Sequence, residues 1–167
     1  AAHMYMDNPP PRGFQGLKGE KNVDYDIMSP ATKMCQGKTR TAPITTVLTA
    51  GQTTKVRLVQ PGNDIITRHD GGHCQFAISY DGGKTFVVLK TVEQRCIIDS
   101  LNYDVPIPAS APSSSNAIFA WTWINATGNR EYYMNCADVI IKGKDGGSIT
   151  GPKLLVVNIL GGPTVPE

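Results

Sequence analysis

A two-residue period in the middle of the chain constrains its fold more than any other feature. In residues 53–59 apolar side chains alternate with lysine and arginine, and in residues 74–80 aromatic and aliphatic side chains return at every second position. Both patterns are typical of strands with one buried face. Asp81-Gly82-Gly83 then supplies residues suited to a tight turn, and the chain returns through residues 85–89. Together these segments predict a β-hairpin.

Three further segments, residues 117–124, 132–141 and 154–160, have the same strand character, and the first places Phe119, Trp121 and Trp123 on one face. Ile and Val outnumber Leu, which favours strands over helices. The 17 glycines and 12 prolines indicate many turns. Residues 1–43 show little periodicity, and we expect extended coil there. About seven or eight strands with polar turns predict an all-β, antiparallel β-sandwich, in a single domain over residues 1–167.

Charge and hydropathy argue against two classes of partner. The net charge is +2 and charged residues make up 18% of the chain, without basic runs. This composition gives no electrostatic case for binding nucleic acid or an anionic membrane surface. No stretch approaches the roughly 20 apolar residues of a membrane span. We therefore expect a soluble monomer.

Four scattered cysteines, Cys35, Cys74, Cys96 and Cys136, form no C-x-x-C pair, which argues against a zinc ribbon or a thioredoxin motif. Two disulfides in an oxidising compartment are the favoured interpretation, and four free cysteines in a cytosolic protein are the alternative. Cys74 and Cys96 flank the predicted hairpin, so we expect them to pair and to leave Cys35 for Cys136. The glycosylation sequon at residues 125–127 fits secretion.

Common catalytic motifs are absent from the sequence, which contains no G-x-S-x-G, P-loop or H-E-x-x-H pattern. Its three histidines are His3, His69 and His73. The last two stand four residues apart with glycines between them, and they could ligate a metal from a loop. For His73 the alternative is a polar loop residue beside a disulfide.

Several segments also follow one another in a specific order. They are residues 3–10 (HMYMDNPP), 24–30 (DYDIMSP), 35–38 (CQGK), 69–75 (HDGGHCQ), 119–123 (FAWTW) and 128–137 (GNREYYMNCA). In this order they resemble the fungal lytic polysaccharide monooxygenases of auxiliary-activity family eleven. The match runs from His3 to about Leu160, with gaps only in loops.

The resemblance implies an immunoglobulin-like β-sandwich that holds one copper ion in a histidine brace. The implied ligands are the α-amine and ring of His3 and the ring of His69, with the Tyr133 phenol in the axial position. Nitrogen ligands suit both oxidation states of copper. Glu131 stands two residues before Tyr133 and would position a bound oxygen species or pass a proton. The alternatives are a surface ion pair for Glu131 and a core aromatic with a backbone-bonded hydroxyl for Tyr133.

Three features of the sequence depart from the family pattern. Asp70 replaces a glycine after the second brace histidine, and His73 replaces a small residue before Cys74. Ala1 and Ala2 precede His3, so the nitrogen of His3 is an amide in the chain as written. Either the alanines are absent from the natural mature protein, or no working brace forms. With a free amine on Ala1, the first three residues are themselves a planar Cu(II) chelate.

The resemblance therefore implies a secreted copper enzyme that oxidatively cleaves a crystalline β-1,4-linked polysaccharide, with chitin as the favoured substrate. Its partners would be the polysaccharide surface and an external electron donor. One alternative is a non-catalytic, secreted copper-binding or cell-wall protein on the same scaffold. Another is a carbohydrate-binding sandwich without a metal, since the fold alone does not decide the function.

Overall fold

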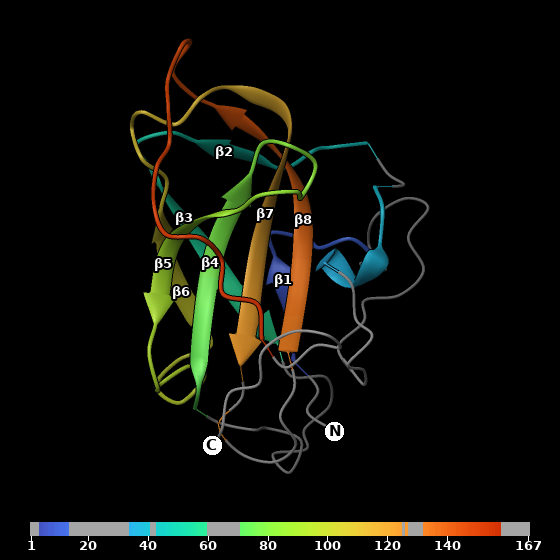
Figure 1. Cartoon of the computed structure of the whole chain (residues 1–167), viewed down its shortest axis with the longest axis vertical. Helices are drawn as coiled ribbons and strands as arrows, with labels where there is room; N and C mark the ends of the chain where they lie inside the picture. Colours follow the sequence, from blue (N-terminus) through green and yellow to red (C-terminus); the bar gives the residue numbers. More distant parts are fainter. Residues whose placement is uncertain are drawn as a thin grey trace.

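A computed structural model describes residues 4–13, 34–40, 43–59, 71–124, 126 and 132–157 of the chain. These residues contain eight strands and one short 3₁₀ helix (Figure 1). In chain order the elements are β1 (Tyr5–Asn8), η1 (Met34–Gly37), β2 (Val47–Thr49), β3 (Thr53–Val59), β4 (His73–Ser79), β5 (Val87–Val92), β6 (Asn102–Pro106), β7 (Ser114–Ile124) and β8 (Tyr132–Lys142). Within the described ranges, no helix is long and apolar enough to cross a membrane.

The strands form two sheets, one of three strands in the order β1-β3-β6 and one of five in the order β2-β8-β7-β4-β5. Figure 1 shows the long strands β4, β7 and β8 side by side, with the three-stranded sheet behind them. The strand pairings are antiparallel except that of β2 with β8, which is parallel. The predicted all-β sandwich is therefore confirmed, with one parallel pair that residue alternation could not reveal.

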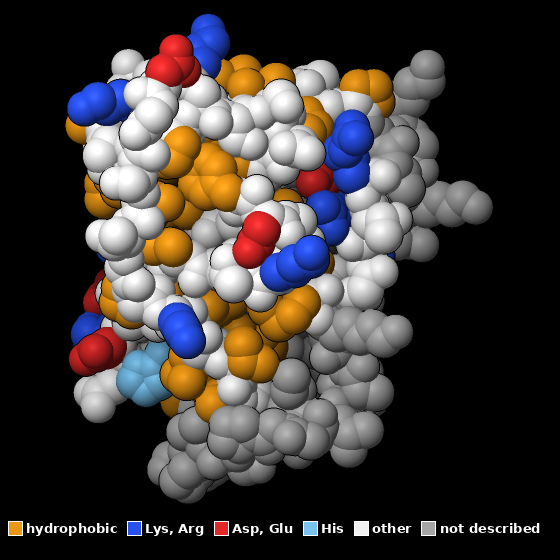
Figure 2. All heavy atoms as spheres, turned by 45° about the horizontal axis from the view of Figure 1, so that its top comes forward, with side chains coloured by type: hydrophobic (Ala, Val, Ile, Leu, Met, Phe, Trp, Pro, Cys, Tyr) orange, Lys and Arg blue, Asp and Glu red, His pale blue; other side chains and the backbone are white. Residues whose placement is uncertain are grey.

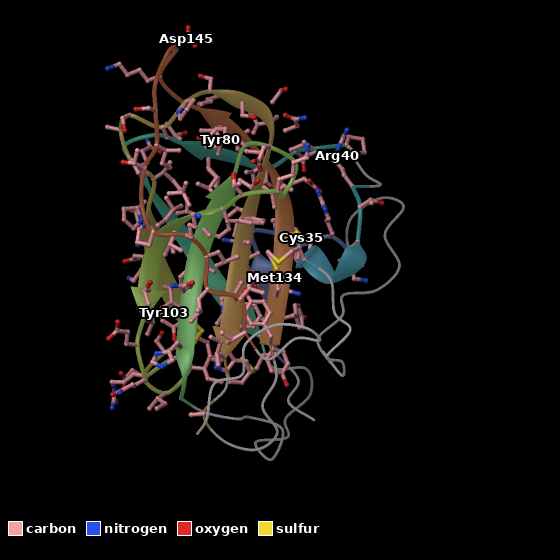
Figure 3. All side chains as sticks on the ribbon, in the orientation of Figure 1. Cys35, Arg40, Tyr80, Tyr103, Met134 and Asp145 are labelled. Carbon is pink, nitrogen blue, oxygen red and sulfur yellow. A yellow bond between two sulfur atoms is a disulfide. The ribbon has the colours of Figure 1, made fainter. Side chains whose placement is uncertain are left out.

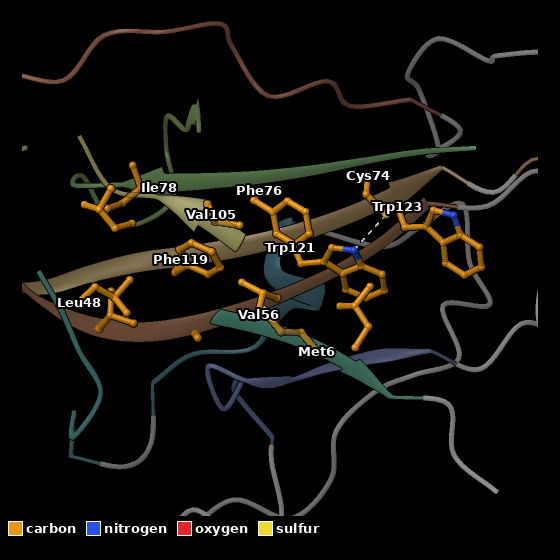
Figure 4. Packing of buried hydrophobic residues seen from close by; sticks show 14 of the residues in the cluster. Met6, Leu48, Val56, Cys74, Phe76, Ile78, Val105, Phe119, Trp121 and Trp123 are labelled. Atoms are coloured by element: carbon orange, nitrogen blue, oxygen red, sulfur yellow. Dashed lines mark hydrogen bonds between the residues drawn. The ribbon is translucent and has the colours of Figure 1, made fainter. Parts of the chain in front are cut away.

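One apolar core lies between the two sheets (Figure 4). Inward-facing residues of the five-stranded sheet and of the three-stranded sheet meet there, and the largest are no more than 1% exposed: Phe76, Ile78, Phe119, Trp121, Trp123 and Tyr133 from the first, and Met6, Val56 and Leu58 from the second. Each fully buried large side chain contributes roughly 1.5–3 kcal/mol relative to an exposed one. The alternation in the sequence correctly predicted which face of each strand is buried, as shown by Phe76, Phe119, Trp121 and Val56.

A second apolar cluster covers the outer face of the five-stranded sheet. Alternate residues of β8 point there, among them Tyr132, Met134 and Cys136. Helix η1 packs on this face, where the Cys35 N–H donates to the Met134 sulfur at 3.3 Å (Figure 3). Residues 154–157 cross the same face (Figure 1), where the Leu155 carbonyl accepts a hydrogen bond from the Tyr132 hydroxyl at 2.7 Å. The five-stranded sheet is thus buried on both faces.

Several predicted strands are confirmed, with shifts of a few residues at their ends. Segment 53–59 is β3, and segments 74–80, 85–89, 117–124 and 132–141 correspond to β4, β5, β7 and β8. The predicted strand 154–160 is wrong over residues 154–157, which form no strand, and its remainder lies outside the described residues. Strands β1, β2 and β6 were not predicted, because each has only three to five residues, too few to establish a period.

Both predicted disulfides are present, Cys35–Cys136 and Cys74–Cys96, and the described residues include no free cysteine. The hairpin turn is also as expected, with Gly82 and Gly83 at φ of 74° and 90°. The first disulfide joins η1 to the outer face of β8, and the second is buried between the sheets.

Candidate functional site

The structure describes one of the four predicted site residues directly. Tyr133 lies on β8, faces the core and has no exposed surface. His3, His69 and Glu131 lie outside the described residues. The described residues closest to them in the chain are Met4, Gly71 and Tyr132, so the structure describes the predicted site only through these residues and their neighbours.

Strand pairing brings these flanking residues to one end of the sandwich. In the three-stranded sheet, Tyr5 at the start of β1 pairs with Val59 at the end of β3. In the five-stranded sheet, Ile124 at the end of β7 pairs with the first residues of both β4 and β8, His73 and Tyr132. The segments that carry His3, His69 and Glu131 therefore enter or leave the sheets at these strand ends.

A buried hydrogen bond joins the two sheets close to this end. The Met6 N–H on β1 donates to the Asn135 side-chain oxygen on β8 at 2.8 Å. Met6 stands three residues after His3, and Asn135 stands two residues after Tyr133. The Asn135 amide is only 3% exposed, so it holds β1 against β8 from inside the core. Leaving a buried donor unpaired costs about 1–3 kcal/mol, which makes this contact a strong constraint on register.

Trp123 connects the chain next to His69 with Tyr133. Its ring lies 4.8 Å from the Tyr133 ring, centroid to centroid. Its indole N–H donates to the carbonyl oxygen of Gly71 at 2.8 Å, and Gly71 stands two residues after His69. All three residues are buried. Two segments that carry predicted ligands therefore share Trp123 as a rigid neighbour.

The backbone at Gly71 and Gly72 requires glycine. Both residues have positive φ, 90° and 76°, which side chains with a Cβ rarely adopt. A Cβ on Gly71 would also lie 3.2 Å from the Cβ of Ala126. The Gly71 N–H donates to the Cys96 carbonyl at 3.0 Å, and Cys96 is bonded to Cys74. The chain from Gly71 onward is thus held by a backbone bond to Cys96, the Cys74–Cys96 disulfide and the indole.

His73 is directed into a structural contact. Its Nδ1 accepts a hydrogen bond from the backbone N–H of Gln94 at 3.2 Å, and the side chain is half-buried at the start of β4. This occupies one ring nitrogen and supports the interpretation of His73 as a polar residue beside the Cys74–Cys96 disulfide. Among the described residues, no group of three or more His, Cys, Asp or Glu side chains could hold a metal ion.

A shallow groove of about 360 Å³ lies over the three-stranded sheet, and its charged lining is paired internally. Arg57 donates to both carboxylate oxygens of Asp7, at 2.8 and 2.7 Å, and this contact raises the pKa of Arg57. Lys55 pairs with Asp104 at 2.7 Å. On the face shown in Figure 2, charged side chains are scattered rather than gathered into one patch.

Solved structures of low sequence identity share the fold. Over 75% of this chain and 67% of the other, the structure resembles CvAA9A with a TM-score of 0.56 and 16% identity. Over 83% of this chain and 99% of the other, it resembles an AA10 lytic polysaccharide monooxygenase from Streptomyces lividans, with a TM-score of 0.57 and 16% identity. At this identity the likeness establishes the fold, which is the β-sandwich found in lytic polysaccharide monooxygenases.

The sequence relatives identify the family. The chain is 38% identical over 180 residues to an AA11 family lytic polysaccharide monooxygenase A of Aspergillus fumigatus, with all of this chain and 79% of the relative covered. It is 28% identical to an AA11 family enzyme of Aspergillus oryzae, of which it spans 38%. No family model matches the chain. The chain belongs to the AA11 family of lytic polysaccharide monooxygenases, which confirms the resemblance found in the sequence.

Sequence reasoning missed the two residues that organise this end of the sandwich. Trp123 was assigned to the core by its period, yet a buried indole N–H usually finds a partner, and that rule pointed to a polar contact. Asn135 is a lone amide in an otherwise apolar stretch of β8. Its burial signals a specific hydrogen bond, but only the fold identifies Met6 as the donor.

Proposed function

We propose that this protein binds one copper ion in a histidine brace at the end of the sandwich described above. The α-amine and ring of His3, the ring of His69 and the Tyr133 phenol would hold the metal. Lytic polysaccharide monooxygenases are copper enzymes that cleave polysaccharides oxidatively. The observation that carries the proposal is the meeting of β1, Gly71 and Tyr133 at one end of the fold.

The proposed ligands fit a copper ion better than a hard cation. Calcium and magnesium prefer clusters of carboxylate oxygens, whereas imidazole and amine nitrogens suit copper. The buried rings of Trp123 and Tyr133 pack together at this end of the sandwich. When bound, the copper supplies the oxidising power that an organic side chain lacks for attack on a C–H bond, using an external electron donor and oxygen or peroxide.

The residues of this chain would then have separate tasks. His3 and His69 hold the metal, and Glu131 holds or passes a proton beside it. Tyr133 closes the buried side through its packing against Trp123. We infer that the substrate is a crystalline β-1,4-linked polysaccharide, with chitin the first to test. The two disulfides support a secreted protein, since such bonds persist in oxidising compartments.

The brace requires a free amine on His3. We therefore expect protein trimmed to begin at His3 to bind Cu(II) through the His3 amine, the His3 ring and the His69 ring. Protein that retains Ala1 and Ala2 should bind Cu(II) through its amine, two deprotonated amides and the His3 ring, without His69. That second mode depends strongly on pH, because protons compete with the metal for these ligands.

The test compares His69→Ala with His73→Ala in protein that begins at His3. His69→Ala should abolish tight single-site Cu(II) binding in calorimetry and change the electron paramagnetic resonance spectrum. His73→Ala should have little effect, because its ring already accepts from Gln94. With ascorbate, the trimmed protein should release oxidised oligosaccharides from chitin, and the extended protein should be nearly inactive. An unchanged spectrum for His69→Ala would refute the brace, and copper binding without any oxidised product would favour a non-catalytic copper-binding protein.

A further inference from the structure

We propose that Trp123 is a positioning residue for the copper site, because it contacts both Gly71, two residues after His69, and the ring of Tyr133. The inference rests on the proposed function. It starts from two contacts of one side chain, the 2.8 Å bond from the indole N–H to the Gly71 carbonyl and the 4.8 Å packing of its ring against Tyr133.

Strand register explains why one residue can act on both segments. Trp123 on β7 pairs with Cys74 on β4 and with Tyr133 on β8, so these three residues form one rung across the sheet. The rung adjoins the last one of these strands, formed by His73, Ile124 and Tyr132. Trp123 is therefore the central member of the buried rung nearest to the segments that carry the predicted ligands.

The hydrogen bond from the indole to Gly71 acts on a backbone that is already constrained. Gly71 has positive φ and a backbone N–H already bonded to Cys96, and its carbonyl is buried and accepts from the indole. Loss of the indole donor would leave the buried Gly71 carbonyl without this bond, which destabilises the local backbone conformation or moves the backbone. Only Asp70 separates Gly71 from His69 in the sequence, so a movement of the Gly71 backbone would be expected to displace His69.

Trp121 provides a matched control within the same strand. It faces the same core, is also fully buried and lies 6.3 Å from Trp123, centroid to centroid. Its indole N–H donates to the Cys74 sulfur at 3.3 Å, as the dashed line in Figure 4 shows, and not to the Gly71 carbonyl. Replacement of either tryptophan by phenylalanine removes a similar volume and one N–H donor, but only one replacement removes the bond to Gly71.

The experiment measures Cu(II) binding and the electron paramagnetic resonance spectrum of Trp123→Phe and Trp121→Phe in protein that begins at His3. We expect about a tenfold or greater loss of Cu(II) affinity for Trp123→Phe, since groups that orient metal ligands typically contribute 10–100-fold. Its spectrum should also show altered copper hyperfine coupling. Trp121→Phe should lose less than about threefold in affinity and keep the wild-type spectrum, with a similar fall in the melting temperature of the metal-free protein.

A second variant separates the hydrogen bond from the packing. Benzothienylalanine at position 123 keeps the ring shape and replaces the N–H by sulfur, so it removes only the donor to Gly71. It should reproduce most of the affinity loss even if Trp123→Phe fails to fold. Equal effects of the two phenylalanine variants, or wild-type affinity with benzothienylalanine, would overturn the role of Trp123. If the wild-type protein that begins at His3 bound no Cu(II), the proposed function would fail, and this inference with it.

Discussion

The two sheets of the sandwich are covered to different extents. The five-stranded sheet packs against the inner core on one face and against η1 and residues 154–157 on the other. The three-stranded sheet shares the same inner core, but its outer face carries ion pairs in which Lys55 and Arg57 are more than half exposed. One sheet is therefore an interior layer, and the other forms part of the surface.

This difference bears on the rigidity of the proposed metal site. Tyr133 and Trp123 belong to the sheet that is buried on both faces, and their backbone cannot move without disturbing two apolar clusters. His3 instead precedes β1, an edge strand of the thinner sheet. The buried bond from Met6 to Asn135 ties this edge to the rigid sheet. We infer that precision at the site comes from the five-stranded sheet and is passed to β1 through Asn135.

The largest effect should follow from removal of the outer cover. Cys35→Ala combined with Cys136→Ala opens a loop with a sequence separation of 101. In the chain-entropy model such a loop stabilises by about 4.7 kcal/mol. We expect a loss of about 4 kcal/mol in the free energy of unfolding by denaturant, and faster hydrogen exchange in residues 34–40. A loss below about 1 kcal/mol would mean that η1 stays packed on the sheet without the Cys35–Cys136 disulfide.

The matched control is Cys74→Ala with Cys96→Ala, which opens a loop with a separation of only 22. The same model assigns this loop about 3.4 kcal/mol. This disulfide holds Cys96, whose carbonyl accepts from the Gly71 N–H. We therefore expect the Cys74 and Cys96 double variant to lose both stability and Cu(II) affinity. The Cys35 and Cys136 double variant should lose stability and keep nearly the same Cu(II) affinity. Equal effects on copper would contradict the assignment of separate roles to the two disulfides.

A loss of stability of similar or smaller size should follow from Met134→Ala. Met134 points to the outer face of the five-stranded sheet, and yet it has no exposed surface and its sulfur accepts from the Cys35 N–H. Truncation of a buried methionine costs about 2–5 kcal/mol. We expect a loss in this range by denaturant unfolding. A loss below about 1 kcal/mol would show that the outer cluster is loosely packed and that the sheet has only one buried face.

The contrast between the sheets also marks how far the sequence could predict the fold. Alternation predicted β3 well because its outer residues, Lys55 and Arg57, are charged. Both faces of β8 are buried, so the residue types of Tyr132 and Met134 do not reveal which face of the sheet they lie on. The resemblance to the family predicted Tyr133 as a site residue, but the contacts of Trp123 and Asn135 depend on distant segments that no local pattern brings together.

The hairpin turn between β4 and β5 offers an effect that depends on pH. Asp81 accepts from the hydroxyl and backbone N–H of Thr85 and from the Ser79 hydroxyl, and these bonds lower its pKa to about 2. Because the folded pKa lies below the unfolded value of about 3.9, the stabilisation is fully present above that value and is lost as the pH falls towards 2. The melting temperatures of wild type and Asp81→Asn should differ at pH 6 and converge near pH 2. A constant difference over this range would show that the carboxylate charge contributes nothing.

The smallest effect should come from Lys55→Ala on the outer face of the three-stranded sheet. Lys55 and Asp104 are 76% and 62% exposed and lie 2.7 Å apart. Exposed ion pairs of this kind contribute about 0.2–1 kcal/mol and weaken with salt. We expect a loss of no more than about 0.5 kcal/mol in the free energy of unfolding, which disappears in 1 M salt. The comparison with Met134→Ala then tests the central contrast, since both residues point outward from their sheets. A loss for Lys55→Ala as large as that for Met134→Ala would mean that the three-stranded sheet is also covered on its outer face.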